Sequence, residues 1–113
     1  MEIICLRWRV AQEKKIQKEI TSRMNLWQNY LSDYWSSPEE YGIAYSHEVR
    51  WRVILQLLTQ VIADNFKEKS IHAALDDKLI FSFRTGDFLW ANELSERFDQ
   101  HNYWFLYGKL PDK

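Results

Sequence analysis

Three histidines, one cysteine and a pair of adjacent aspartates are the residues that could carry chemistry in this sequence. Asp76-Asp77 could hold a metal or act as a base, but adjacent aspartates before an apolar run more often form a turn. The histidines share no helix face with one another or with Cys5 at ligand spacing, whereas zinc sites normally contain a close ligand pair. We therefore expect no metal site and no cofactor. The three histidines are His47, His72 and His101.

Motifs of nucleophilic and phosphate chemistry are missing from the sequence. No GxSxG is present, and no sequence neighbourhood marks a serine as activated. Phosphate-binding loops need several glycines ahead of a helix, whereas Gly42, Gly86 and Gly108 are each isolated. We interpret Cys5 as a small buried hydrophobe. The sequence names no catalytic residue, and we expect that the protein is not an enzyme.

Aromatic residues are unusually frequent, with six Trp, six Tyr and six Phe. Several of them fall around one expected helix connection, and two interpretations stay open. They form either an aromatic corner that packs the connection together, or an exposed surface for a partner, because Trp and Tyr dominate interface hot spots. This second candidate surface consists of Trp27, Tyr30, Tyr34, Trp35, Tyr41, Tyr45 and Trp51.

The two ends of the sequence differ in charge, although the net charge is only -1. Residues 7–23 are mainly basic, and residues 87–99 carry four carboxylates against Arg97 alone. Charge runs are usually solvated faces, but a polarised surface can also steer a charged partner. We take the acidic segment and its aromatic neighbours as the first candidate surface, namely Asp87, Trp90, Glu93, Glu96, Asp99, Tyr103 and Tyr107.

Two short segments place a tryptophan between arginines, Arg7-Trp8-Arg9 and Arg50-Trp51-Arg52. Basic residues that alternate with aromatic ones can form a single-strand nucleic acid site, in which bases stack on the rings. Neither segment lies in a recognisable RNA-binding strand pattern, and the near-neutral net charge disfavours a nucleic acid partner. Nucleic acid therefore ranks behind protein as the expected partner.

The first long element has an apolar stripe that predicts an α-helix over about residues 6–35. Its residues recur every three or four positions, and a helix of that length would be about 45 Å long. Since a compact domain of this size has a radius of gyration of about 13–14 Å, we expect a break near residues 9–14, with a short strand over 2–8. The alternative is a helix that projects from the body. The stripe is Ile16, Ile20, Met24, Trp27, Leu31 and Tyr34.

Capping signals predict two further helices. Ser37, Pro38 and Glu40 resemble a capping box, and Gly42 should end this short helix. Ser46 can then cap a second long helix, whose broad apolar face predicts a central, well-buried position. That face contains Val49, Val53, Ile54, Leu57, Leu58, Val61, Ile62 and Phe66.

The C-terminal third has weaker signals. One helical turn is expected from Ser70 through Leu75, followed by a turn at Asp76-Asp77. The alternation of large apolar residues over 79–83 suits a strand, but period alone leaves a helix open for this segment. Asp87 should cap a helix that ends near Phe98. Residues 103–107 have strand propensity, and either pair with 79–83 or continue the preceding helix.

The sequence as a whole predicts one mainly α-helical domain over residues 1–113, with two long amphipathic helices and a small two-stranded β element in its C-terminal third. Its 113 residues, 46% of them hydrophobic, suffice for one core. No stretch resembles a secretory signal or a membrane span. The single cysteine fits a reducing compartment, so we expect a cytoplasmic protein without membrane contact.

These patterns favour a protein-binding module. The most concrete version is an inhibitor of the immunity-protein or antitoxin type, which blocks a basic toxin domain with an acidic, aromatic-anchored surface. A self-associating structural or assembly factor, paired through the first helix as a homodimer, is the alternative. A single-stranded nucleic acid binder ranks third among the expected functions, and an enzyme ranks fourth.

Overall fold

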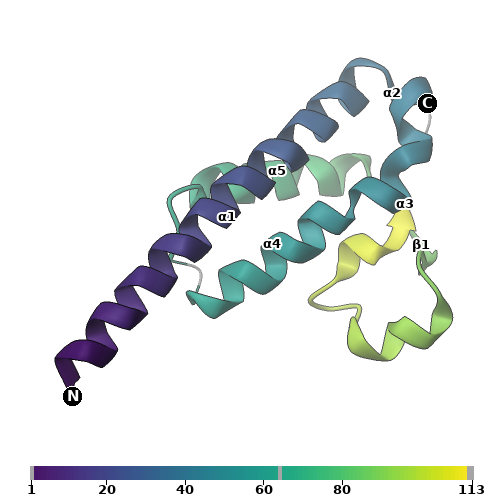
Figure 1. Cartoon of the computed structure of the whole chain (residues 1–113). Helices are drawn as coiled ribbons and strands as arrows, with labels where there is room; N and C mark the ends of the chain where they lie inside the picture. The colour runs from purple at the N-terminus through teal and green to yellow at the C-terminus, as the bar shows by residue number, and fades with distance from the viewer. Residues whose placement is uncertain (1, 64, 112–113) are drawn as a thin grey trace.

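The computed structural model describes residues 2–63 and 65–111, and for residues 2–8 it describes the backbone alone. The chain folds mainly into α-helices, with a small antiparallel sheet near the C-terminus, as the sequence predicts. Figure 1 shows α1 and α4 running side by side, with α5 behind them and the C-terminal segment below α4. No helix among the described residues has both the length and the apolar character needed to cross a membrane.

Helix α1 spans Glu2–Ser36 without interruption. The predicted break near residues 9–14 and the predicted strand over 2–8 are therefore wrong, and the projecting helix is the correct alternative (Figure 1). The physical reason is local, because the first proline and the first glycine of the chain come only at Pro38 and Gly42. The predicted stripe is confirmed from Ile20 to Tyr34, where its residues are buried.

Three short helical segments connect α1 to α4: α2 (Pro38–Tyr41), η1 (Gly42–Ala44) and α3 (Tyr45–Glu48). Pro38 occupies the first turn of α2 as predicted, but the side chain of Ser37 forms no capping hydrogen bond. Instead its carbonyl accepts hydrogen bonds from the amides of Glu40 and Tyr41. Gly42 adopts a right-handed helical conformation, so it continues the helical path that it was predicted to end.

The second predicted long helix is divided in two. Ser46 lies inside α3 and caps nothing, and α4 covers Arg50–Val61. Its predicted apolar face is only partly buried, since Val53 is in the core whereas Val61 is 68% exposed. Phe66 is buried but lies beyond the helix end. Helix α4 packs mainly against α1, so apolar residues on the rest of its broad face, such as Leu57 and Val61, stay on the outside.

Helix α5 covers Lys69–Ser82. The predicted turn at Asp76-Asp77 is therefore wrong, and of the two alternatives for residues 79–83 the helix is correct as far as Ser82. Leu75 and Leu79 are the buried residues of the helix, and their spacing of four places them on one face. A tertiary contact stabilises the aspartate inside the helix, because Arg52 donates two hydrogen bonds to Asp76, at 2.9 and 2.8 Å.

The C-terminal segment contains β1 (Arg84–Phe88), η2 (Asn92–Arg97), η3 (Trp104–Leu106) and β2 (Tyr107–Lys109). The strands pair antiparallel, with Arg84 opposite Lys109 and Phe88 opposite Tyr107. A two-stranded element is thus confirmed, and Tyr107 lies in one of its strands, but residues 79–83 and 103–106 lie outside both strands. Asp87 lies in β1, so it does not cap the predicted helix, which is replaced by η2.

The β pair depends on one glycine. Gly108 has a φ of 155°, which side chains rarely adopt. A Cβ atom there would lie 2.2 Å from the carbonyl oxygen of Arg84 and 2.6 Å from the ring of Phe83. Only glycine therefore allows β2 to approach β1 this closely.

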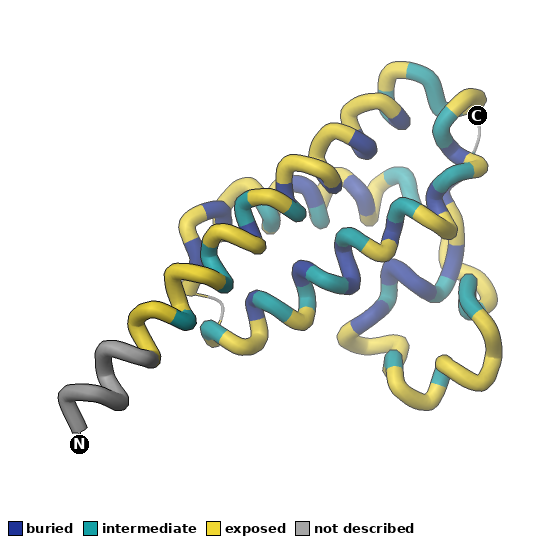
Figure 2. Tube along the Cα trace, viewed as in Figure 1, coloured by how far each residue is buried: buried dark blue, intermediate teal, exposed yellow. Residues whose placement is uncertain are grey.

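The core lies between the helices and the last residues of the chain. Figure 2 shows buried positions recurring along α1, α4 and α5, while the N-terminal part of α1 outside residues 2–8 is mostly exposed. Two charged side chains enter the core. Arg52 binds Asp76 and lies 4.4 Å from the ring centre of Phe105. Glu68 accepts hydrogen bonds from Gln17, at 2.8 Å, and Thr21, at 2.9 Å, which fastens α1 to the segment before α5.

Candidate functional site

The four carboxylates of the first candidate surface all lie on the outside of the molecule. Asp87 ends up in β1, Glu93 and Glu96 in η2, and Asp99 after it, and all four are exposed. We call residues 87–99 the acidic loop. Figure 2 shows that exposed residues predominate along it. The ion pairs found among the described residues lie on α1, α4 and α5, so these carboxylates remain available to a cation from outside.

Aromatic rings pack against the inner side of the acidic loop, and Phe98 contacts three of them. The ring of Phe98 lies 5.0 Å from that of Tyr103, 5.6 Å from that of Trp90 and 6.5 Å from that of Phe88. The hydroxyl of Tyr107 donates to the carbonyl of Phe98 at 2.6 Å. Edge-to-face contacts of this kind add to the apolar burial. A loop with little regular structure thereby acquires a defined shape.

Trp90, Tyr103 and Tyr107 have a different position from the one predicted. Tyr103 is buried, and the other two are half-buried. The indole Nε1 of Trp90 donates to the carbonyl of Ser46 at 2.9 Å, which connects the acidic loop to α3. These three rings support the surface from inside, so the outer contact face consists mainly of the carboxylates.

Asp99 has a structural task as well. Its carboxylate accepts hydrogen bonds from the amide nitrogen of Asn102, at 3.0 Å, and from the side-chain amide of the same residue, at 3.2 Å. These bonds lower the pKa of Asp99 below its ordinary value of 3.8. Asp99 therefore stays ionised and also closes the turn that follows the acidic loop.

The second candidate surface is mostly interior. Trp27, Tyr30, Tyr34 and Tyr45 are buried, in agreement with the packing-corner interpretation. Trp27 lies 6.0 Å from Tyr30 and 6.4 Å from Tyr45, between ring centres. The hydroxyl of Tyr34 donates to the carbonyl of Pro111. The remaining members are half-buried, namely Trp35, Tyr41 and Trp51.

The buried tyrosines are hydrogen-bond donors rather than acid–base groups. The hydroxyl of Tyr45 donates to the carbonyl of Phe105 at 2.6 Å, and that of Tyr30 to the carbonyl of Tyr41 at 2.9 Å. Burial raises the pKa of both phenols well above 10.0, because a phenolate would lose its hydration. Both hydroxyls therefore keep their protons at neutral pH.

The structure separates the residues of the Arg50-Trp51-Arg52 segment. Arg52 is buried and paired with Asp76, while Arg50 lies 4.5 Å from the ring centre of Trp51. Trp51 also donates to Glu48 at 3.0 Å. The three side chains thus do not share one face on which bases could stack. In the other segment, Arg9 is exposed, and the side chains of Cys5, Leu6, Arg7 and Trp8 lie outside the described residues.

The histidines lie in different places. His47 and His101 are exposed, and His72 packs against Phe66 with ring centres 5.7 Å apart. Nowhere in residues 9–63 and 65–111 do three or more His, Cys, Asp or Glu side chains gather as a metal site would require.

Phe81 is the surface residue that the sequence interpretation missed. It is 95% exposed, next to Ile80 at 56%, and it borders a hollow of about 390 Å³ lined by Trp35, Pro38 and Phe83. The signal was present, because a helix with Leu75 and Leu79 inward turns Phe81 outward.

Comparison of the chain with protein families, with characterised proteins and with solved structures gave no match.

Proposed function

We propose that the protein is a binding module of the inhibitor type, which blocks a basic protein, most concretely a toxin domain, with its acidic loop. The observation that carries the proposal is the combination of exposed carboxylates with an aromatic base formed around Phe98. Complementary charge steers a basic partner and gives specificity. A loop that already has its bound shape loses little conformational entropy on binding.

The experiment uses the product of the gene that adjoins this one. We expect that product to be a basic domain that is toxic when expressed alone, and we expect co-expression of this chain to relieve the toxicity. Reversal of the loop charge, Glu93→Lys with Glu96→Lys, should abolish the relief, because the carboxylates that attract the toxin become cations.

The matched control reverses the same amount of charge elsewhere. Glu39→Lys with Glu40→Lys changes two exposed carboxylates of α2 and should leave protection intact. Full protection by the loop-reversed variant would contradict the role of the acidic loop. An adjoining product that is neither basic nor toxic would contradict the inhibitor role itself.

The second candidate function is a self-associating assembly factor. The observation that favours it is the length of α1, in which residues 9–15 are mostly exposed before the packed part of the helix begins (Figures 1 and 2). Helical segments without tertiary packing are marginal in water, so a second molecule that covers this segment would stabilise it.

A further inference from the structure

Two oppositely charged surfaces lie at opposite sides of the molecule. We call residues 9–18 the basic arm, in which Arg9, Lys14, Lys15 and Lys18 are exposed and Glu13 is the one acidic residue. In Figure 1 the basic arm lies toward the lower left and the acidic loop toward the lower right, with α4 between them. The long dimension of the molecule is 56 Å.

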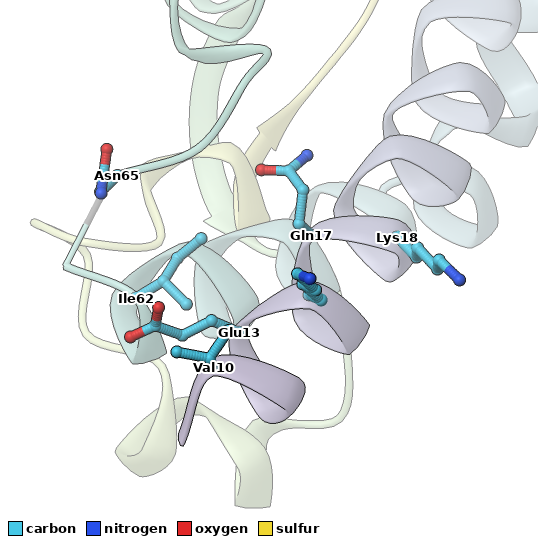
Figure 3. Close-up of a pocket in the computed structure, with 7 residues that line it drawn as sticks. Val10, Glu13, Gln17, Lys18, Ile62 and Asn65 are labelled. Carbon is cyan, nitrogen blue, oxygen red and sulfur yellow. The ribbon is translucent and has the colours of Figure 1, made fainter. Parts of the chain in front are cut away.

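The basic arm borders a groove of about 530 Å³ against the end of α4. Val10, which is 46% exposed, and Ile62 supply its apolar walls. In Figure 3 the side chains of Val10, Glu13 and Ile62 gather at one place, whereas Lys18 points away from them. The lining includes Lys14 as well as Lys18, so the groove combines small apolar walls with one carboxylate and two lysines, of which Lys18 lies at its edge.

The acidic loop carries the complementary set of groups. Leu94 is 38% exposed and lies in η2 between Glu93 and Glu96, with Arg97 next to them. One apolar side chain is therefore flanked by two carboxylates and one guanidinium. The groove offers apolar walls flanked by two ammonium groups and one carboxylate, so each group of the loop has a counterpart of opposite charge there.

We propose that two copies of the chain pair antiparallel about a two-fold axis, each placing Leu94 in the groove of the other. Glu93 and Glu96 then face Lys14 and Lys18 of the second copy, and Arg97 faces its Glu13. A two-fold axis forms both contacts at once, which closes the assembly at two molecules.

Apolar residues of α4 support the same arrangement. Leu57 and Val61 are four residues apart, which places them on one face of the helix, and both are exposed. Because α4 runs between the two charged surfaces (Figure 1), a second copy that reaches from one surface to the other passes over this helix. Covering the two side chains removes apolar surface from water and contributes to association.

Pairing goes beyond the inhibitor role but uses the same acidic loop. A basic toxin domain therefore competes with the second copy for these carboxylates. The basic arm belongs to the pairing alone, so variants of the arm separate the two functions.

A charge-swap experiment tests the proposal. The arm-reversed variant is Lys14→Glu with Lys18→Glu, and the loop-reversed variant is Glu93→Lys with Glu96→Lys. Sedimentation equilibrium of the unmodified chain at an ionic strength of about 0.1 M should give a dimer. Each variant alone should be monomeric, because its arm and its loop then carry the same sign. An equimolar mixture should again give a dimer. In it the negative reversed arm of one variant meets the positive reversed loop of the other, and the native loop of the first meets the native arm of the second.

Two controls show whether the loss is specific. Lys69→Glu with Lys78→Glu reverses two exposed lysines of α5 and should leave the dimer unchanged. Leu94→Ser should weaken dimerisation by about tenfold or more, without a change in the melting temperature of the monomer measured at concentrations too low for dimerisation. The arm-reversed variant should still neutralise a toxin, since its loop is intact.

The proposal is overturned by a monomer at every concentration of the unmodified chain, or by a loop-reversed variant that remains dimeric. A mixture of the two variants that stays monomeric also overturns it. A mass that keeps growing with concentration would overturn the two-fold arrangement, because open head-to-tail contacts do not close.

Discussion

At the scale of single residues, Asp76 and Asp77 are adjacent and chemically identical, yet they have different surroundings. The sequence presents them as one pair typical of a turn, yet both lie inside α5. Asp76 is bound by the buried Arg52, whose Nη2 is 2.8 Å from its Oδ2, whereas Asp77 is exposed. One member of the pair thus neutralises a guanidinium in the core, and the other lies on the exposed side of the helix.

Asp76→Asn should lower the free energy of unfolding by about 2–3 kcal/mol, because the buried guanidinium loses its counter-charge. Urea denaturation followed by circular dichroism measures this change. Asp77→Asn is the matched control and should stay within about 0.5 kcal/mol. Equal losses for the two variants would show that Arg52 does not depend on Asp76.

Tyr103 was a candidate for partner contact, yet it is buried. Trp27 had two interpretations, a packing corner or a partner surface, and its burial agrees with the first. Aromatic residue type alone cannot distinguish these cases, since the same ring stabilises a core or an interface by burying apolar area. The carboxylates of the acidic loop were easier to place, because an unpaired charge is costly to bury.

At the scale of elements, α5 shows how a short apolar run can mislead. Large residues alternate at 79, 81 and 83, which is the period of a strand, but the same residues also fit the end of a helix that begins at Lys69. The two readings make opposite statements about Phe81. A strand would place the side chains of Phe81 and Leu79 on the same face, whereas the helix places Phe81 on the face opposite to Leu79.

Leu79→Ala should cost about 2–5 kcal/mol of stability, as is usual for large-to-small changes in a core. Phe81→Ala should change stability by less than about 0.5 kcal/mol, because its ring is 95% exposed. Chemical denaturation of both variants tests the helical assignment. A similar loss for both would favour the strand.

Helix α1 was expected to break because its length seemed incompatible with a compact domain. The expectation of compactness was the weaker premise. The segment from residue 10 to 20 contains Ala, Gln, Glu, Lys and Ile with no helix breaker, and such residues propagate a helix at little cost. Local helix preference therefore extends α1 toward the N-terminus, beyond the residues that pack against the rest of the molecule.

At the scale of the whole molecule, the projecting helix makes the protein elongated. Its principal extents are 56, 32 and 19 Å, and its radius of gyration is 15.9 Å. A compact chain of this length would have a radius of gyration of about 13 Å. The N-terminal part of α1, which projects from the body, accounts for the elongation (Figure 1). It also increases the distance between the positive and negative surfaces and thereby strengthens the charge asymmetry that both proposals use.

Small-angle X-ray scattering of the arm-reversed variant should give a radius of gyration at or slightly above 15.9 Å, since this variant is expected to be monomeric. The unmodified dimer should give a larger value, and the difference should disappear as salt screens the charged contacts. A monomer near 13 Å would mean that α1 folds back onto the body.

Periodicity and residue type were sufficient to predict four features: the helical fold class, the buried stripe of α1 from Ile20 to Tyr34, a β pair near the C-terminus, and the exposure of the carboxylates. These features depend on local preference and on the cost of burying charge, and both can be read from neighbouring residues.

Contacts between residues that are distant in the sequence determined the features of the fold that the sequence did not predict. Arg52 keeps Asp76 within a helix, Gly108 lets β2 reach β1, and Phe98 collects the rings that shape the acidic loop. Each of these effects joins segments that are separated along the chain, and their energies exceed the small differences in local preference between a helix, a strand and a turn. For that reason, the strand register, the burial of Tyr103 and the helical course of residues 79–82 followed from packing in three dimensions.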